Sequence, residues 1–141
     1  MARMKLDLPQ KFDFATDIPV QIANINYGGH LGNDSLLSLI HEARIRFLKV
    51  HGFTEWDIGG VGIIMVDTVI LYKAESFQGD VLTFEVGVKN VGRMGCDFVY
   101  KVTNKEKKKD VAHVKTAVVF FDYTERKVVN TPDVFVRLFK Q

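Results

Sequence analysis

The stretch that decides the fold runs from Asn24 to Leu48 and reads NINYGGHLGNDSLLSLIHEARIRFL. It begins as a polar, glycine-rich loop and passes without a break into the longest helical pattern of the chain. Leu37, Ile45 and Leu48 widen the apolar stripe of this pattern, so we expect a helix that is buried on most sides. The stripe itself recurs at steps of three and four residues, the spacing of one helix face: Leu36, Leu39, Ile40, Ala43, Phe47 and Val50.

Both ends of this helix are marked in the sequence. Asn33, Asp34 and Ser35 are all good N-cap residue types, and His51-Gly52 is typical of a helix C-terminus. A helix of about 18 residues is roughly 27 Å long. Its free N–H groups and the positive end of its dipole point back at the glycine loop, where they can polarise a carbonyl or hold an anion.

The remaining sequence has the texture of β-strands. Pro19 in the first strand-like segment indicates an edge strand or a strand start. The strands follow the helix as a group and do not alternate with helices, which favours an α+β fold with an antiparallel sheet curled round one long helix. The predicted strand segments are 12–22, 63–73, 82–88, 98–102 and 111–123, and 128–129 extends the sheet.

Length and composition predict one domain over residues 1–141, because 141 residues with 47% apolar side chains can bury a sizeable core. A formal net charge of +2 is too small to indicate nucleic-acid binding. The single cysteine, Cys96, excludes an internal disulfide and a thiolate metal cluster. His41, His51 and His113 have no partner pattern for a metal site, so we expect neither a metal nor another cofactor.

Two further patterns concern location and partners. No apolar run approaches the ~20 residues of a membrane span, and the N-terminus lacks the apolar region of a signal peptide. We therefore expect a soluble, cytoplasmic protein with no membrane contact. The dense basic run Lys105–Lys109 is flanked by strand-like segments and is interpreted as a solvated hairpin tip.

The loop before the helix carries a recognisable motif, Asn24-x-Asn26-x-Gly28-Gly29-His30-x-Gly32-Asn33. With it, the chain resembles the hotdog-fold acyl-CoA thioesterases, in the branch of the 4-hydroxybenzoyl-CoA thioesterases. That branch reads Asp-x-Asp-x-Gly-Gly or Asp-x-Asp-x-Asn-x-His-x-Asn-Asn at these positions. Its second Asp, commonly the catalytic carboxylate, is Asn26 here.

The resemblance covers nearly the whole chain and carries several expectations. It implies one sheet wrapped around one central helix, in homodimers or homotetramers with acyl-CoA lying across the dimer interface. An uncovered sheet face and an open sheet edge independently favour a second copy of the chain as a partner. Glu42, twelve residues after His30, also matches the branch.

Asn26 and His30 are the first candidate catalytic residues. The amide of Asn26 cannot take up a proton, but it can orient a water or hold the thioester; alternatively it bonds its own loop backbone. Histidine is the side-chain type whose unperturbed pKa, about 6.5, suits general-base work at neutral pH. His30 is therefore either the base or a turn histidine that satisfies a backbone carbonyl.

The glycines and the helix start are candidates for binding the substrate. Gly28, Gly29 and Gly32 let the backbone approach a substrate closely, or they simply serve the turn. Because they stand immediately before the helix, the backbone N–H of Asn33 or of its neighbour is the predicted donor to an oxyanion.

Glu42 and Arg93 complete the candidate set. Glu42 lies nine residues from Asn33, hence ~13 Å along the helix. It therefore either pairs with Arg46 at i,i+4, orients other groups, or serves the site of a second protomer. Arg93, at a predicted hairpin turn with Lys89 beside it, is the candidate for the phosphates of CoA.

The sequence thus predicts an acyl-CoA thioesterase in which water attacks the thioester carbonyl and the helix N-terminus stabilises the oxyanion. Two alternatives remain. One is a non-catalytic acyl-CoA or lipid-binding hotdog protein that lost its carboxylate at position 26. The other is an acyl-carrier-protein thioesterase that docks an acidic carrier, for which the Lys105–Lys109 tip is available.

Overall fold

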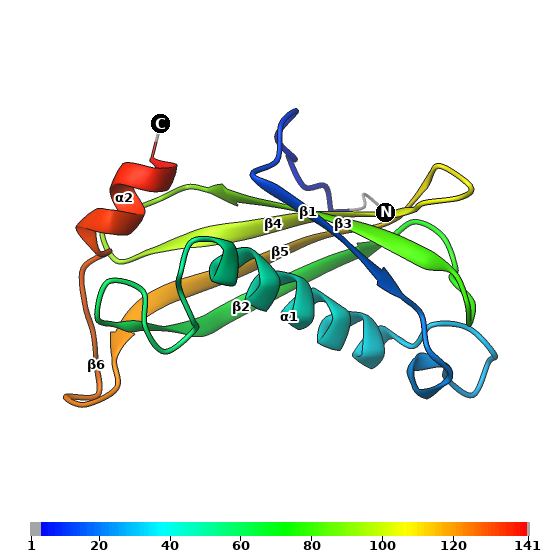
Figure 1. Cartoon of the computed structure of the whole chain (residues 1–141), viewed down its shortest axis with the longest axis horizontal. Coiled ribbons are helices and arrows are strands. Elements are labelled where there is room, and N and C mark those ends of the chain that lie inside the picture. The colour runs from blue at the N-terminus through cyan, green and yellow to red at the C-terminus, as the bar shows by residue number, and fades with distance from the viewer. Residues whose placement is uncertain (1–3, 141) are drawn as a thin grey trace.

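The computed structural model describes residues 4–140 and has the predicted α+β architecture (Figure 1). The sheet is antiparallel throughout, with the strand order β1-β3-β4-β5-β2 and a short β6 paired with β5. Helix α1 crosses one face of this sheet. The elements are β1 (Phe14–Pro19), η1 (Ile22–Asn24), α1 (Asn33–Val50), β2 (Gly62–Tyr72), β3 (Val81–Lys89), β4 (Gly95–Asn104), β5 (Lys109–Asp122), β6 (Lys127–Val128) and α2 (Asp133–Phe139).

The ends of α1 show one correction and one confirmation. The N-cap is Gly32, which has no side chain to cap the helix, so the predicted cap types Asn33, Asp34 and Ser35 occupy the first turn instead. There the side-chain oxygen of Asn33 accepts a hydrogen bond from the Asp34 N–H at 3.1 Å. The predicted stop is correct, since Gly52 follows the helix with φ of 78°, a left-handed conformation that favours glycine.

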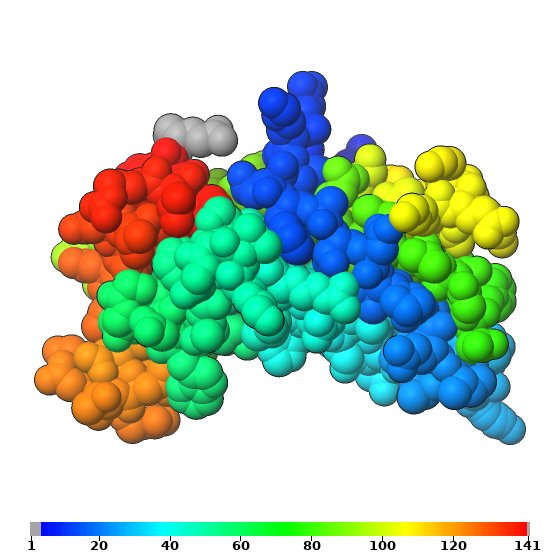
Figure 2. Space-filling model, viewed as in Figure 1, coloured from blue at the N-terminus to red at the C-terminus, as the bar shows by residue number. Residues whose placement is uncertain are grey.

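The core lies between α1 and the sheet. The buried face of α1 follows the predicted stripe from Leu36 to Phe47. The expectation of burial on most sides is wrong for the single chain, because Val50, Leu37 and Ile45 are exposed. Figure 2 shows the outer surface of α1 uncovered on this face of the molecule. The sheet contributes side chains that alternate toward α1, among them Leu82, Phe84, Val86, Phe98, Tyr100, Val102, Val114, Val118 and Phe120.

Helix α2 was absent from the sequence prediction, and it closes the far end of this core. Phe135 and Phe139 are its buried residues. The ring of Phe135 lies 5.1 Å from that of Phe120, and the ring of Phe139 lies 5.6 Å from that of Phe47. A helix of 7 residues is too short to produce a clear periodic pattern in a sequence.

The sheet edges follow the prediction. β1, which ends at Pro19, pairs only with β3, and β2 pairs only with β5 within the described residues. A register shift interrupts β4 and β5: Val102 pairs with Ala112 and Thr103 with Asp110, so Val111 is the extra residue of a bulge. Among residues 4–140, no helix combines the length and apolar character that a membrane span requires.

A buried ionic network connects α1 to the sheet and to the connector that follows it. Arg44 is only 5% exposed. Its guanidinium donates to Glu55 at 2.7 Å and to the Tyr100 hydroxyl at 3.0 Å, and that hydroxyl lies 2.9 Å from Thr116. His41 reaches the other oxygen of Glu55 at 2.8 Å. The network therefore holds the connector before β2 against both layers of the fold.

This network predicts how stability depends on pH. Burial opposes ionisation of Glu55, but the hydrogen bonds from Arg44 and His41 outweigh it and hold its pKa below the usual range. The stability that Glu55 contributes is therefore present above pH ~4.5 and is lost as the pH falls through the lower pKa of the folded state. Urea titrations between pH 7 and pH 3 should show this loss.

The variant Glu55→Gln tests the assignment. It leaves the buried Arg44 without its carboxylate, so unfolding at pH 7 should become easier by on the order of 3 kcal/mol. The variant should also lose less stability than the wild type on acidification. The exposed Glu106→Gln is the control and should change stability by less than about 0.5 kcal/mol. Equal pH profiles for wild type and Glu55→Gln would contradict the role given to this network.

Candidate active site

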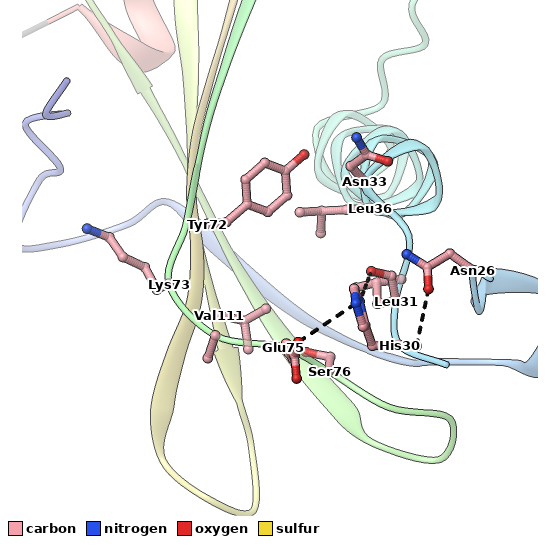
Figure 3. A pocket seen from close by; sticks show the side chains of 11 residues that line it. Asn26, His30, Leu31, Asn33, Leu36, Tyr72, Lys73, Glu75, Ser76 and Val111 are labelled. Atoms are coloured by element: carbon pink, nitrogen blue, oxygen red, sulfur yellow. Dashed lines mark hydrogen bonds and ion pairs between the residues drawn. The ribbon is translucent and has the colours of Figure 1, made fainter. Parts of the chain in front are cut away.

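A cavity of about 540 Å³ opens at the N-terminal end of α1 (Figure 3). Its walls come from segments that lie far apart in the sequence. The loop before α1 provides Asn26, His30 and Leu31, and the helix provides Asn33 and Leu36. The end of β2 and the segment after it provide residues 72–76, and β5 provides Val111. The structure thus brings three of the predicted site residues, Asn26, His30 and Asn33, to one cavity.

Backbone hydrogen bonds hold the two loops of this cavity together. The N–H of Leu31 donates to the carbonyl of Ser76 at 2.7 Å. The carbonyl of the bulged Val111 accepts from Lys73 at 2.8 Å and from Ala74 at 3.2 Å. The loop before α1 and the segment 73–76 therefore form a connected rim, with the bulge of β5 as its anchor.

Asn26 determines the shape of the loop before α1. Its side-chain oxygen accepts from the N–H of Gly28 at 2.9 Å and from that of His30 at 3.3 Å. Its own N–H donates to the His30 carbonyl at 2.8 Å. Gly29 completes the turn with φ of 83°. Asn26 thus bonds its own loop backbone, as the structural alternative expects, and at the same time lines the cavity.

His30 faces both its own loop and the opposite rim. Its Nδ1 lies 3.3 Å from the carbonyl oxygen of Leu31, and its Nε2 lies 3.8 Å from Oε1 of Glu75. When Nδ1 donates to this carbonyl, the neutral ring keeps its lone pair on Nε2. This nitrogen is therefore available to accept a proton.

The start of α1 supplies free donors. No hydrogen bond within residues 4–140 uses the N–H of Asn33 or of Ser35. Gly32 is tightly enclosed here: a Cβ at this position would lie 2.7 Å from a carboxylate oxygen of Asp34 and 3.2 Å from Cβ of Asn26. A glycine at position 32 therefore lets the loop pass close to the helix start, where the N–H groups can bind a developing negative charge.

Several lining residues were missed in the sequence, among them Tyr72, Glu75 and Ser76. Figure 3 shows the ring of Tyr72 pointing toward Asn33 and Leu36 at the helix start. Partial burial raises the pKa of the Tyr72 phenol, and like any phenol it is a hydrogen-bond donor at neutral pH. Ser76 is 1% exposed, and its hydroxyl has no partner in the described part of the chain.

Glu42 and Arg93 lie outside the cavity of their own chain. Glu42 pairs with Arg46 at 2.7 Å, and Arg46 in turn reaches Thr16 and the Asp17 carbonyl on β1. Arg93 lies in the turn before β4, whereas the cavity lies beyond the opposite end of that strand. The structure of one chain therefore does not bring these two residues to the other candidates.

The described residues contain no cluster of potential metal ligands. Between residues 4 and 140, no three His, Cys, Asp or Glu side chains lie together where they could hold a metal ion. Cys96 is buried, and burial together with the charge of Asp97 raises the pKa of its thiol well above the ordinary value. It is therefore a poor nucleophile.

Comparison with known proteins identifies the family. A model of the thioesterase-like superfamily matches residues 20–139, which is most of the chain. The chain belongs to the thioesterase-like superfamily. Membership supports thioester hydrolysis as the general activity. No curated protein matches the chain by sequence.

Solved structures confirm the hotdog fold. A 1,4-dihydroxy-2-naphthoyl-CoA thioesterase from Synechocystis superposes with a TM-score of 0.78 at 21% identity, covering 86% of this chain and 91% of its own. A hypothetical protein from Aquifex aeolicus superposes with a TM-score of 0.80 at 22% identity, and the match covers 90% of this chain and 99% of that protein. A thioesterase-superfamily protein from Jannaschia superposes with a TM-score of 0.81 at 16% identity, and the match covers 93% of this chain and 83% of that protein.

Proposed function

We propose that this protein hydrolyses acyl-CoA thioesters in the cavity at the start of α1. The observation that carries the proposal is that His30 and Asn33, whose backbone N–H is free, line one cavity at the start of α1. Family membership supports cleavage of a thioester bond. The Synechocystis protein of the same fold is named for an aromatic acyl-CoA substrate. We also propose that CoA is the thiol that carries the acyl group.

The reaction needs one base and one oxyanion site. Nε2 of His30 takes a proton from water as the water oxygen attacks the thioester carbonyl carbon. The carbonyl oxygen becomes negative and is stabilised by the N–H groups at the start of α1. The intermediate collapses with cleavage of the C–S bond, and the imidazolium returns its proton to the leaving thiolate. Free acid and CoA thiol are the products.

His30→Ala tests the base. If His30 takes the proton, the variant should lose about 10²–10⁴-fold in kcat/KM. In the wild type, kcat/KM should fall on the acid side, because a general base must be free of its proton to act. Thiol release followed across pH measures both effects. A variant with full activity and the same acid limb would show that another group activates the water.

The alternative function, non-catalytic acyl-CoA binding, rests on the amide at position 26. Asn26→Asp separates the two functions, because a carboxylate can still accept from Gly28 and His30 while it adds a base to the cavity. We expect thiol release by the wild type from at least one member of a panel of acyl-CoAs and acyl carrier proteins. We also expect Asn26→Asp to add activity that persists at lower pH. Binding without thiol release by the wild type, combined with release by Asn26→Asp, would favour the binding protein.

We further propose that the protein works as a homodimer or homotetramer. β2 is an open edge strand whose residues Met65 and Val66 are exposed, and Leu37 and Ile45 of α1 are also uncovered. A second copy would cover these apolar side chains and pair the free strand. It would also offer the only route by which Glu42 or Arg93 could serve a cavity, namely that of the partner.

Light scattering at micromolar concentration measures the assembly. The expected mass is at least twice the 16.0 kDa of one chain. Replacing Val66, which is exposed on the edge strand, with Lys should shift the population toward single chains, because a charge would then have to be buried at the contact. A mass near 16 kDa for the wild type would exclude both the dimer and a shared site.

A further inference from the structure

The loop before α1 offers no carboxylate to the cavity, but the opposite rim does. Glu75 lies in the segment after β2, and Oε1 of its side chain is 3.8 Å from Nε2 of His30 (Figure 3). The backbone around Glu75 is held in place on both sides, because Ala74 bonds the Val111 carbonyl and the Ser76 carbonyl bonds Leu31. The carboxylate is thus presented to the histidine by a fixed rim.

The separation of 3.8 Å exceeds the length of a direct hydrogen bond. It suits a bridging water, because a water with bonds of about 2.8 Å can reach two acceptors that lie about 4 Å apart. With the His30 Nδ1 directed to the Leu31 carbonyl, Nε2 and Oε1 of Glu75 are both acceptors. A water has two protons, one for each of them.

Several amide and carbonyl oxygens around the cavity already accept hydrogen bonds, whereas the hydroxyls of Tyr72 and Ser76 have no partner among residues 4–140. The side-chain oxygen of Asn26 accepts two backbone N–H groups, and that of Asn33 accepts the N–H of Asp34. The carbonyls of Ser76 and Val111 accept bonds from the rim itself. The carboxylate of Glu75 therefore stands out as an acceptor that is both charged and next to the base.

We propose that Glu75 is the carboxylate of the active site and that it holds the attacking water jointly with His30. This inference rests on the proposed function. The water gives one proton to Nε2 of His30 as its oxygen bonds the carbonyl carbon, while its second proton stays directed to Glu75. The negative charge of Glu75 then lies beside the imidazolium that forms. Lys73 is the other charged residue that lines the cavity, and its side-chain nitrogen points away from His30 in Figure 3. Asp34 lies at the helix start, beside Gly32.

The experiment compares Glu75→Gln and Glu75→Asp with a matched control. Glu75→Gln keeps the size of the side chain and removes its charge, and kcat should fall about 10²-fold with KM nearly unchanged. Glu75→Asp keeps the charge on a shorter side chain, so its kcat should lie between that of the wild type and that of Glu75→Gln. Glu125→Gln is the control, because its side chain is 61% exposed against 65% for Glu75 and it lies far from the cavity, in the turn before β6.

A double variant distinguishes shared action from an unrelated defect. If the two residues hold one water, His30→Ala with Glu75→Gln should be no slower than His30→Ala alone. Binding of a ketone analogue, in which CH₂ separates the sulfur from the carbonyl, should be unchanged in Glu75→Gln, since the carboxylate holds water and not the acyl group. Thermal unfolding should also be unchanged, because Glu75 is exposed.

Three results would overturn the inference. Glu75→Gln with wild-type kcat would remove the role of the carboxylate and leave the function of His30 intact. Additive losses in the double variant, or weaker binding of the ketone analogue by the same factor as kcat, would assign Glu75 to substrate binding or structure. A wild type that releases no thiol from any acyl-CoA would overturn the proposed function itself and Glu75 with it.

Discussion

The packing of the apolar face of α1 against the sheet is the constraint on which the rest of the structure depends. Phe47, Leu36 and Ile40 bury this face almost completely, and α2 closes the core at the far end of the helix. With the helix held in this way, its N-terminus lies at one end of the sheet, beside the end of β2 and the bulge in β5. The cavity is a consequence of where the helix begins.

The buried charge of Arg44 restricts how α1 can be positioned on the sheet. A purely apolar contact between α1 and the sheet would tolerate sliding, because hydrophobic burial has no direction. Arg44 needs Glu55 and Tyr100 at defined distances, and it loses those partners if the helix shifts. The same bonds fasten the connector before β2, and so they also influence where that strand starts along the sheet.

The sequence predicted the fold well and the cavity in part. Periodicity placed α1, and alternation with turn residues placed the long strands, because both are local patterns. The short α2 has no such pattern. No local pattern marks Arg44 as buried either, because its partner Tyr100 lies 56 residues away in the sequence. Asn26, His30 and Asn33 belong to one continuous motif and were found together. Glu75 and Ser76 come from another part of the chain, and the pairing of β2 with β5 and the backbone bond from Leu31 to Ser76 bring them to that motif. The available signal was the segment Lys73–Ser76, in which three of four residues are polar and which begins at the last residue of a predicted strand.

The rim of the cavity is fastened by backbone atoms, and this has an evolutionary consequence. The bonds from Leu31 to Ser76 and from Ala74 to Val111 use N–H and carbonyl groups that almost every amino acid possesses. Side chains at positions 73–76 can therefore be exchanged without dismantling the scaffold that presents them. A lineage with this architecture is free to move a catalytic group from one rim to the other, and selection can retune the chemistry of the cavity while the fold stays as it is.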